Sequence, residues 1–396
     1  LLTEARLTWA TRAVLLLLIA AGIAARIYDL GYPESLVFDE HHFVKNARNY
    51  LATRSDWNDH PPLGKLVIAL GLLAEGDNAT GWRLASLTCG VLLVLLSYLV
   101  GARTFGRREA GLYAAAFVAA SGFLIVYSRT AHLDGMLATV MTVAALCMWR
   151  SKSRLGMFAS TALIGVAASI KFTGVVLTIP WALLSFRRFG VEGRTVALLS
   201  GGLGLMVGTY VALFSLGLAV AGDPHGVADV GHKSLELLQH HWGLDDWENA
   251  ATSRWYTWFI PLSRINMHFV RNGGEIRALT TADNPVLWWG VNVAVAWSAF
   301  LLIRRSLEPA GPSYLLLLWT VPLLPWIFTN RDSYIYHYVP SYAFGLMLMG
   351  GSVAMLERPV LRFIFVAAVA VVFVSCAPVW STIPFAADSW LHRIFY

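Results

Sequence analysis

Long apolar segments recur along almost the whole chain, and they constrain its fold more than any other feature. Eleven stretches approach the ~20 apolar residues that a helix needs to cross a bilayer: 9–29, 80–102, 110–128, 133–149, 156–170, 172–186, 195–221, 285–303, 313–329, 334–356 and 360–378. Only 14% of the residues are charged, which excludes an ordinary soluble domain. The sequence therefore predicts an all-α integral membrane protein, with about 11 transmembrane helices in one domain that spans residues 1–396.

Basic residues are concentrated in the short connections between these segments. Short cytoplasmic loops contain an excess of Lys and Arg, so the N-terminal end is predicted to lie inside. This orientation turns two long polar segments outward, residues 31–76 and residues 222–284. The first apolar segment has the basic flank of a signal peptide, but its length favours an uncleaved anchor. We interpret the basic residues as topology signals and not as a nucleic-acid surface, and we expect a multi-pass protein of the plasma membrane.

Two adjacent acids, Asp39 and Glu40, lie just after the first apolar segment, in the outward segment 31–76. Ionisable residues at a membrane edge are costly, and such a pair indicates a functional site. The alternative is a solvated loop start or a helix N-cap. Residues 41–53 have apolar side chains at a spacing of three and four, which predicts a short amphipathic helix on the membrane surface. That helix would hold the two acids rigidly at its start, so segment 31–76 is the candidate catalytic loop.

The same outward segment contains His60 and Lys65, which flank two prolines at the start of the next apolar helix. Prolines are tolerated in a first helical turn because the amide they lack has no partner there. Lys65 would then place an ammonium group near the positive end of the helix, where a phosphate could bind. The alternative for Lys65 is a lysine that extends to the membrane surface.

Further charged residues are predicted at the same membrane face, in other outward turns. Arg129 and Asp134 belong to one short turn and could simply pair with each other. Lys171 lies where the fifth and sixth apolar segments meet, and Arg331 and His337 lie in the last outward turn. Such a set suits a substrate with a lipid tail and a charged phosphate head, because cations hold the phosphate and an acid handles a proton.

Other site chemistries find less support in the sequence. The acids and histidines around Asp39 are possible metal ligands, but they lack the spacing of a tetrahedral zinc site. No cofactor is predicted, and a divalent metal is possible but not expected to be essential. Nucleotide-binding glycine loops and hydrolase signatures are absent from the sequence. The segment 222–284 shows little helical periodicity and is too long for an ordinary connection, so we expect a folded outer lid.

Several motifs resemble those of the protein O-mannosyltransferase family, which belongs to the GT-C glycosyltransferases. Their order and spacing match over nearly the whole chain: Phe38-Asp39-Glu40, His60-Pro-Pro-Leu-Gly-Lys65, Gly81-Trp82-Arg83, Ser128-Arg129, Leu133-Asp134, Lys171-Phe-Thr-Gly174, Asn284-Pro285 and Tyr336-His337-Tyr338. The sequence departs from the family at Asn58, where an Asp is frequent. No MIR-like domain interrupts segment 222–284, which is typical of the bacterial form.

The resemblance implies a GT-C fold and an inverting transfer of mannose from a polyprenyl-phosphate donor to a Ser or Thr hydroxyl of an exported protein, on the extracytoplasmic face. It implies that Asp39 is the catalytic base, that Glu40 positions the acceptor, and that Arg129 contacts the donor phosphate. A GT-C transferase of aminoarabinose or arabinose to lipid A or a cell-wall glycan is an alternative. A lipid transporter or flippase is a more remote one, since such proteins place charges near the bilayer midplane and often show repeats.

Overall fold

Helices dominate the structure, a computed structural model that describes residues 8–223, 227–244, 251–304, 310–329 and 331–396. Every predicted apolar segment coincides with a helix or with a helical run. These are α1 (Trp9–Ile27), α4 (Ala79–Thr104), α5 (Arg108–Ala120) with α6 (Gly122–Ser128), α7 (Leu133–Arg150), α8 (Arg154–Ile170), the 3₁₀ helix Phe172–Leu177 with α9 (Thr178–Phe189), α10 (Gly193–Val220), α12 (Pro285–Ile303), α13 (Ala310–Thr320) with α14 (Leu324–Ile327), α15 (Val339–Ala354) and α16 (Pro359–Ser381).

By length and composition, seven helical runs of the described residues can cross a membrane, or eight if the bent pair α5–α6 forms one span. The sequence predicted about eleven spans. The other three predicted spans correspond to shorter helices, since α8, α9 and α15 contain 17, 12 and 16 residues. The chain is thus a mostly helical, multi-span membrane protein.

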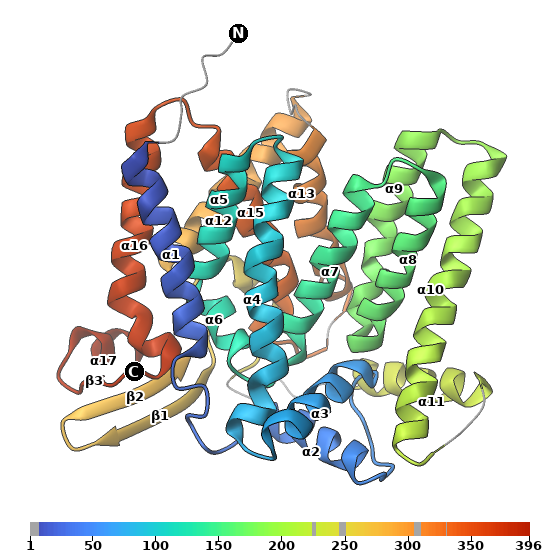
Figure 1. Ribbon diagram of the computed structural model, residues 1–396, viewed down its shortest axis with the longest axis horizontal. Helices are drawn as coiled ribbons and strands as arrows, with labels where there is room; N and C mark the ends of the chain where they lie inside the picture. Colours follow the sequence, from blue (N-terminus) through green and yellow to red (C-terminus); the bar gives the residue numbers. More distant parts are fainter. Residues whose placement is uncertain (1–7, 224–226, 245–250, 305–309, 330) are drawn as a thin grey trace.

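The short elements outside the bundle gather at one of its ends, which lies at the bottom of Figure 1. They are the helices α2 (Glu40–Leu51), α3 (Leu63–Glu75), α11 (Val227–Trp242) and α17 (Trp390–Phe395), together with three strands. The basic connections lie at the opposite end: α4 starts beside α3 and runs for 26 residues, with Arg103 in its last turn and Arg107 and Arg108 just after it. The bundle therefore has one basic end and one end that contains the candidate site.

A small antiparallel sheet corrects the prediction of an all-α fold. Strands β1 (Asn266–Asn272), β2 (Glu275–Thr280) and β3 (Phe385–Ala386) pair in the order β1-β2-β3. The turn between β1 and β2 consists of Gly273 and Gly274, and Gly273 has a φ of +59°. Glycine pairs favour such tight hairpin turns because positive φ costs them little. The described part of segment 222–284 thus contains a hairpin and the helix α11, where the sequence predicted a lid with little helical periodicity.

The break between α5 and α6 bends the chain by 67° in the interior of the bundle. The Arg26 guanidinium donates to the carbonyls of Val118 and Ala119 at the end of α5, at 2.9 and 2.8 Å. On the other side of the break, the Asp283 carboxylate accepts from the amide of Phe123 at 3.2 Å. Backbone groups freed inside a membrane must find such partners. The bend redirects α6 so that the turn after it lies against the candidate catalytic loop.

Candidate active site

Asp39 immediately precedes α2 and occupies its N-cap position, but its side chain makes no capping hydrogen bond. The preceding residue, Phe38, has a φ of +45°, which is strained for an aromatic residue. Among the residues that the structure describes, no side-chain hydrogen bond engages the Asp39 carboxylate, which is partly buried. This carboxylate is therefore free to accept a proton or a hydrogen bond from a substrate.

The surroundings of Asp39 combine burial with a nearby positive charge. Burial raises the pKa of Asp39 to about 6, and the Lys171 ammonium opposes part of that rise. The Phe38 ring stacks on His132 and meets Tyr336 edge-on, with centroids 6.1 and 6.3 Å apart. The Lys171 Nζ lies 4.8 Å from the centroid of the same Tyr336 ring. Asp39 thus has a pKa close to neutral pH, as suits a general base.

Glu40 is completely buried, and four hydrogen bonds occupy its carboxylate. Arg83 donates Nε to Oε1 at 2.9 Å and Nη2 to Oε2 at 3.1 Å. The backbone amides of Val37 and Ala131 donate to the same group at 2.9 and 2.8 Å. The carboxylate therefore joins the start of α2 to α4 and to the turn before α7, and its geometry leaves little capacity for an acceptor hydroxyl.

Lys171 and Asp134 form a buried ion pair, with the Lys171 Nζ 2.9 Å from both carboxylate oxygens of Asp134. Asp134 lies in the first turn of α7, and Lys171 lies just after the last turn of α8. The sequence left open a pair between Arg129 and Asp134. The structure pairs Asp134 with Lys171 instead, because the ends of α7 and α8 lie side by side.

Arg129 was expected to contact the donor phosphate, but its guanidinium is buried against the ends of two other helices. It donates to the carbonyls of Ala25 at 2.8 Å and Asp29 at 3.2 Å, and to the Thr382 hydroxyl at 3.2 Å. These contacts tie the turn after α6 to the ends of α1 and α16. The geometry favours an anchoring role for Arg129 over a place in a substrate cavity.

A cavity of about 280 Å³ opens beside the Lys171–Asp134 pair. Its polar lining comes from Lys171, Arg331 and three histidines, His60, His241 and His337. Its apolar lining includes Trp242 of α11 and Phe328 after α14, whose side chains are 80% and 82% exposed. This amphiphilic cavity brings together four residues predicted from the sequence, and it suits a ligand with an anionic head and an apolar tail.

Aromatic and polar contacts fix the histidines and the arginine that line this cavity. The His337 ring stacks on Trp326 with centroids 3.6 Å apart, and the His60 ring stacks on His241 at 4.9 Å. Arg331 bonds the His241 Nδ1 through Nη1 at 3.0 Å, and its guanidinium lies 5.6 Å from the Trp326 ring. The guanidinium is partly buried and has donors left for a ligand.

Lys65, in contrast, turns away from the cavity. Its ammonium is fully buried and donates to the backbone carbonyl of His60. Burial lowers the pKa of Lys65 to about 7. The bond closes the first turn of α3, so Lys65 shapes the loop that presents the His60 ring.

Three residues at the site received no role from the sequence: Arg83, His241 and Tyr336. Arg83 had a detectable signal, because a lone arginine near the start of a long apolar helix requires a buried partner. Tyr336 belonged to the Tyr336-His337-Tyr338 motif, which gave it no specific role. The place of His241 at the site could not be read from the sequence, since it depends on how α11 packs against distant segments. Among the described residues, no group of three or more His, Cys, Asp or Glu side chains lies close enough to hold a metal ion.

Sequence comparisons match three family models to the chain. Two are described as dolichyl-phosphate-mannose-protein mannosyltransferase and match residues 15–77 and 59–216. The third, the C-terminal four TMM region of protein-O-mannosyltransferase, matches residues 228–393. A polyprenol-phosphate-mannose–protein mannosyltransferase from Mycolicibacterium smegmatis is 23% identical, over 98% of this chain and 92% of that protein. The similarity therefore extends along both chains almost completely.

Comparisons with solved structures agree with the sequence comparisons. A chain of the Saccharomyces cerevisiae protein O-mannosyltransferase Pmt1-Pmt2 complex superposes with a TM-score of 0.79 at 13% identity, over 96% of this chain and 91% of that chain. ArnT from Cupriavidus metallidurans, bound to undecaprenyl phosphate, superposes with a TM-score of 0.61 at 16% identity, over 86% of this chain and 60% of that one. At such identities the likeness shows a shared fold.

Proposed function

The chain belongs to the protein O-mannosyltransferase family and is a polyprenol-phosphate-mannose–protein mannosyltransferase, and from this premise we propose that Asp39 is its catalytic base. The observation that supports this most is the Asp39 carboxylate itself, which has no hydrogen-bond partner among the described residues. Its neighbour Glu40 is saturated by Arg83 and two amides. We therefore assign the chemistry to Asp39 and the positioning of the loop to Glu40.

The proposed reaction is an inverting transfer to a Ser or Thr hydroxyl. The hydroxyl oxygen attacks C1 of the mannosyl unit from the face opposite the phosphate, while its proton passes to the Asp39 carboxylate. The bond between C1 and the phosphate oxygen breaks, and the polyprenyl phosphate leaves with both bonding electrons. This leaving group is stabilised by cations and needs no general acid.

We place the donor in the cavity beside the Lys171–Asp134 pair. Lys171 and Arg331 supply the positive charge for the phosphate, and His60 and His337 supply polar ring atoms for the phosphate or the sugar. The exposed Trp242 and Phe328 suit the first isoprene units of the lipid tail. This placement replaces Arg129 as the phosphate ligand, because the Arg129 guanidinium is already committed to α1 and to Thr382.

Replacing Arg331 tests this placement. We expect Arg331→Gln to weaken the binding of polyprenyl phosphate roughly tenfold, because a charge-assisted hydrogen bond to the phosphate is lost. Titration of purified protein with the lipid phosphate would measure the change in Kd. Arg271→Gln is a matched control, since Arg271 is an exposed arginine of β1 at the same end of the bundle. An unchanged Kd in Arg331→Gln would remove Arg331 from the phosphate site.

The pH dependence of transfer should reflect the Asp39 carboxyl, whose pKa is about 6. A general base acts only when ionised, so kcat/KM is expected to be constant above this pKa and to fall about tenfold per pH unit below it. The measurement is kcat/KM against pH between about 4.5 and 8, with stability followed separately. A profile without an acid limb near pH 6 would contradict the assignment.

We propose a GT-C fold with eleven membrane spans, in which α5–α6, α8, α9 and α15 join the seven longer runs, a plasma-membrane location and an active site on the extracytoplasmic face. The gathering of α2, α3 and α11 opposite the basic connections supports this orientation. Segment 31–76 is then the catalytic loop, and segment 222–284 provides the outer cover of the donor cavity.

The direct test of the function uses purified protein, labelled polyprenyl-phosphate mannose and a Ser/Thr-rich peptide. We expect the label to appear on the peptide through a hydroxyl-linked sugar. Label transferred to a glycolipid or glycan in place of the peptide would favour the aminoarabinose and arabinose transferases with the same fold.

A further inference from the structure

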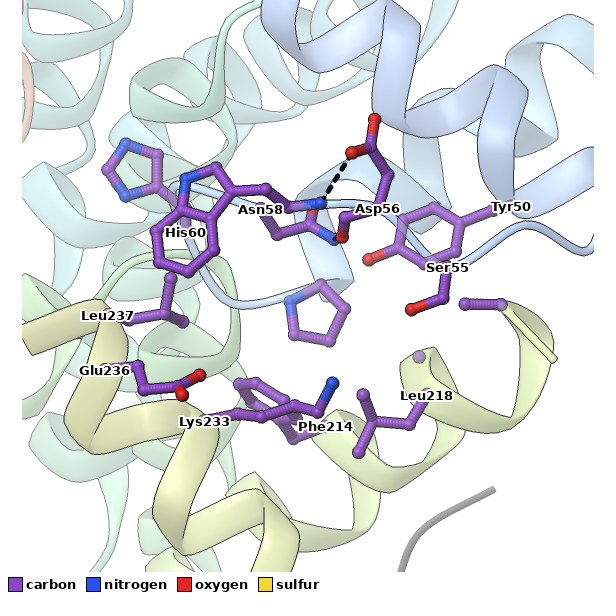
Figure 2. Close-up of a pocket in the computed structure, with 14 residues that line it drawn as sticks. Tyr50, Ser55, Asp56, Asn58, His60, Phe214, Leu218, Lys233, Glu236 and Leu237 are labelled. Atoms are coloured by element: carbon purple, nitrogen blue, oxygen red, sulfur yellow. Dashed lines mark hydrogen bonds between the residues drawn. The ribbon is translucent and has the colours of Figure 1, made fainter. Parts of the chain in front are cut away.

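A second cavity lies beside the donor cavity, between the catalytic loop and the outer ends of two helices (Figure 2). One side comes from Tyr50 at the end of α2 and from residues 55–62. The other side comes from the last turns of α10, with Phe214 and Leu218, and from α11, with Lys233 and Glu236. We call this cavity the loop groove. Its volume is about 80 Å³, much smaller than the donor cavity.

The two sides of the loop groove differ in chemistry. The α10 side is apolar and closely packed: a Cβ on Gly217 would approach the ring of Pro62 to 2.4 Å. The opposite side presents the Ser55 hydroxyl, whereas the Asp56 carboxylate is occupied by Lys45, Asn49 and the backbone amide of Trp57. On α11, Lys233 pairs with Asp223 at 2.8 Å, and Glu236 adds a carboxylate to the lining. An extended polypeptide matches this arrangement, because it offers backbone donors and acceptors on its edges and side chains to either face.

His60 connects the loop groove to the donor cavity, because it lines both. Its ring lies 6.0 Å from Phe43, one turn into the helix that Asp39 begins, and it stacks on His241. A chain that occupies the groove therefore continues past His60 toward the Asp39 carboxylate and the bound donor.

We propose that the loop groove is a subsite for the acceptor polypeptide, which holds residues next to the Ser or Thr that is modified; this rests on the proposed function. The helix α2 sets the distance between the Asp39 carboxylate and the far end of the loop groove. Tyr50 follows Asp39 by eleven residues, which at 1.5 Å per residue is about 17 Å. An extended peptide rises about 3.4 Å per residue, so the far end of the groove receives a residue about five positions from the modified hydroxyl.

The size of the groove limits which side chains it takes. A volume of about 80 Å³ admits small side chains and excludes an indole or phenol ring. The enzyme should therefore select acceptor segments with small residues three to five positions from the modified hydroxyl. This selectivity arises at a site separate from the base and from the phosphate cations.

The test compares two peptides, each with one Thr and otherwise small residues. The short peptide has about two residues on each side of the Thr, which cannot reach the groove, and the long one has about seven. The wild-type protein is expected to have a KM about tenfold lower for the long peptide. Ser55→Trp, which fills the groove from the exposed loop, should raise that KM to the value for the short peptide. The matched control Ser55→Ala should keep the preference.

Glu236→Trp fills the groove from the opposite side and provides a second variant if Ser55→Trp fails to fold. Transfer to the short peptide should remain unchanged in each folded variant, because neither residue touches the donor cavity. A wild-type enzyme without preference for the long peptide, or a preference that survives in the folded Trp variants, would overturn the subsite. Failure of the wild-type protein to modify either peptide would instead count against the proposed function.

Discussion

Asp39→Asn is expected to lower kcat for mannosyl transfer by at least a thousandfold, close to complete loss. A general base contributes about 10² to 10⁴ in rate, and an amide cannot take the hydroxyl proton. The substitution preserves the shape of the side chain, and no side-chain hydrogen bond between residues that the structure describes depends on the carboxylate. Donor affinity should therefore stay within about twofold of the wild-type value.

The measurement combines single-turnover transfer to a Thr peptide with titration of the lipid donor. Glu34→Gln is the matched control, since Glu34 is an exposed carboxylate of the same loop and its loss should leave both quantities unchanged. Turnover retained by purified Asp39→Asn would exclude Asp39 as the base. If weaker donor binding accounted for the whole loss of turnover, Asp39 would belong to the donor site instead.

Hydropathy predicted the helices well because the constraint is physical: in a bilayer, every backbone group needs a partner within its own segment. The same reasoning could not identify broken elements. The break at Ser121 inside segment 110–128 depends on Arg26 and Asp283, which bind its free backbone groups from distant parts of the sequence. The sequence analysis did not predict the hairpin of β1 and β2 for a different reason. Its strands are short and lie in segment 222–284, which was interpreted from its length as a lid.

The candidate site was predicted in part. The topology predicted from the basic connections brings Asp39, His60, Lys171, Arg331 and His337 to one membrane face, and the structure joins the last four around one cavity. The roles of individual cations could not be predicted, because burial and partners are set by packing between distant segments. Arg129 is a clear case, since its guanidinium binds carbonyls about a hundred positions earlier in the chain.

Glu40→Gln should destabilise the protein, unlike the substitution at the neighbouring Asp39. The Glu40–Arg83 pair is fully buried on both sides, and removing one partner of such a pair leaves an uncompensated charge at a cost of about 3–5 kcal/mol. A lower Tm in detergent and a loss of transfer are therefore expected together. Asp39→Asn should leave Tm unchanged or raise it, because burial already disfavours the ionised Asp39 carboxyl and raises its pKa.

A double variant separates positioning from chemistry at Glu40. Glu40→Gln combined with Arg83→Met removes both buried charges, so Tm should recover by about half or more relative to Glu40→Gln alone. Transfer should recover less, because the amides of Val37 and Ala131 lose the carboxylate that fixes the loop around Asp39. If Glu40→Gln abolished transfer without any change in Tm, Glu40 would act on the substrate. Asp39 would then share the chemistry with its neighbour.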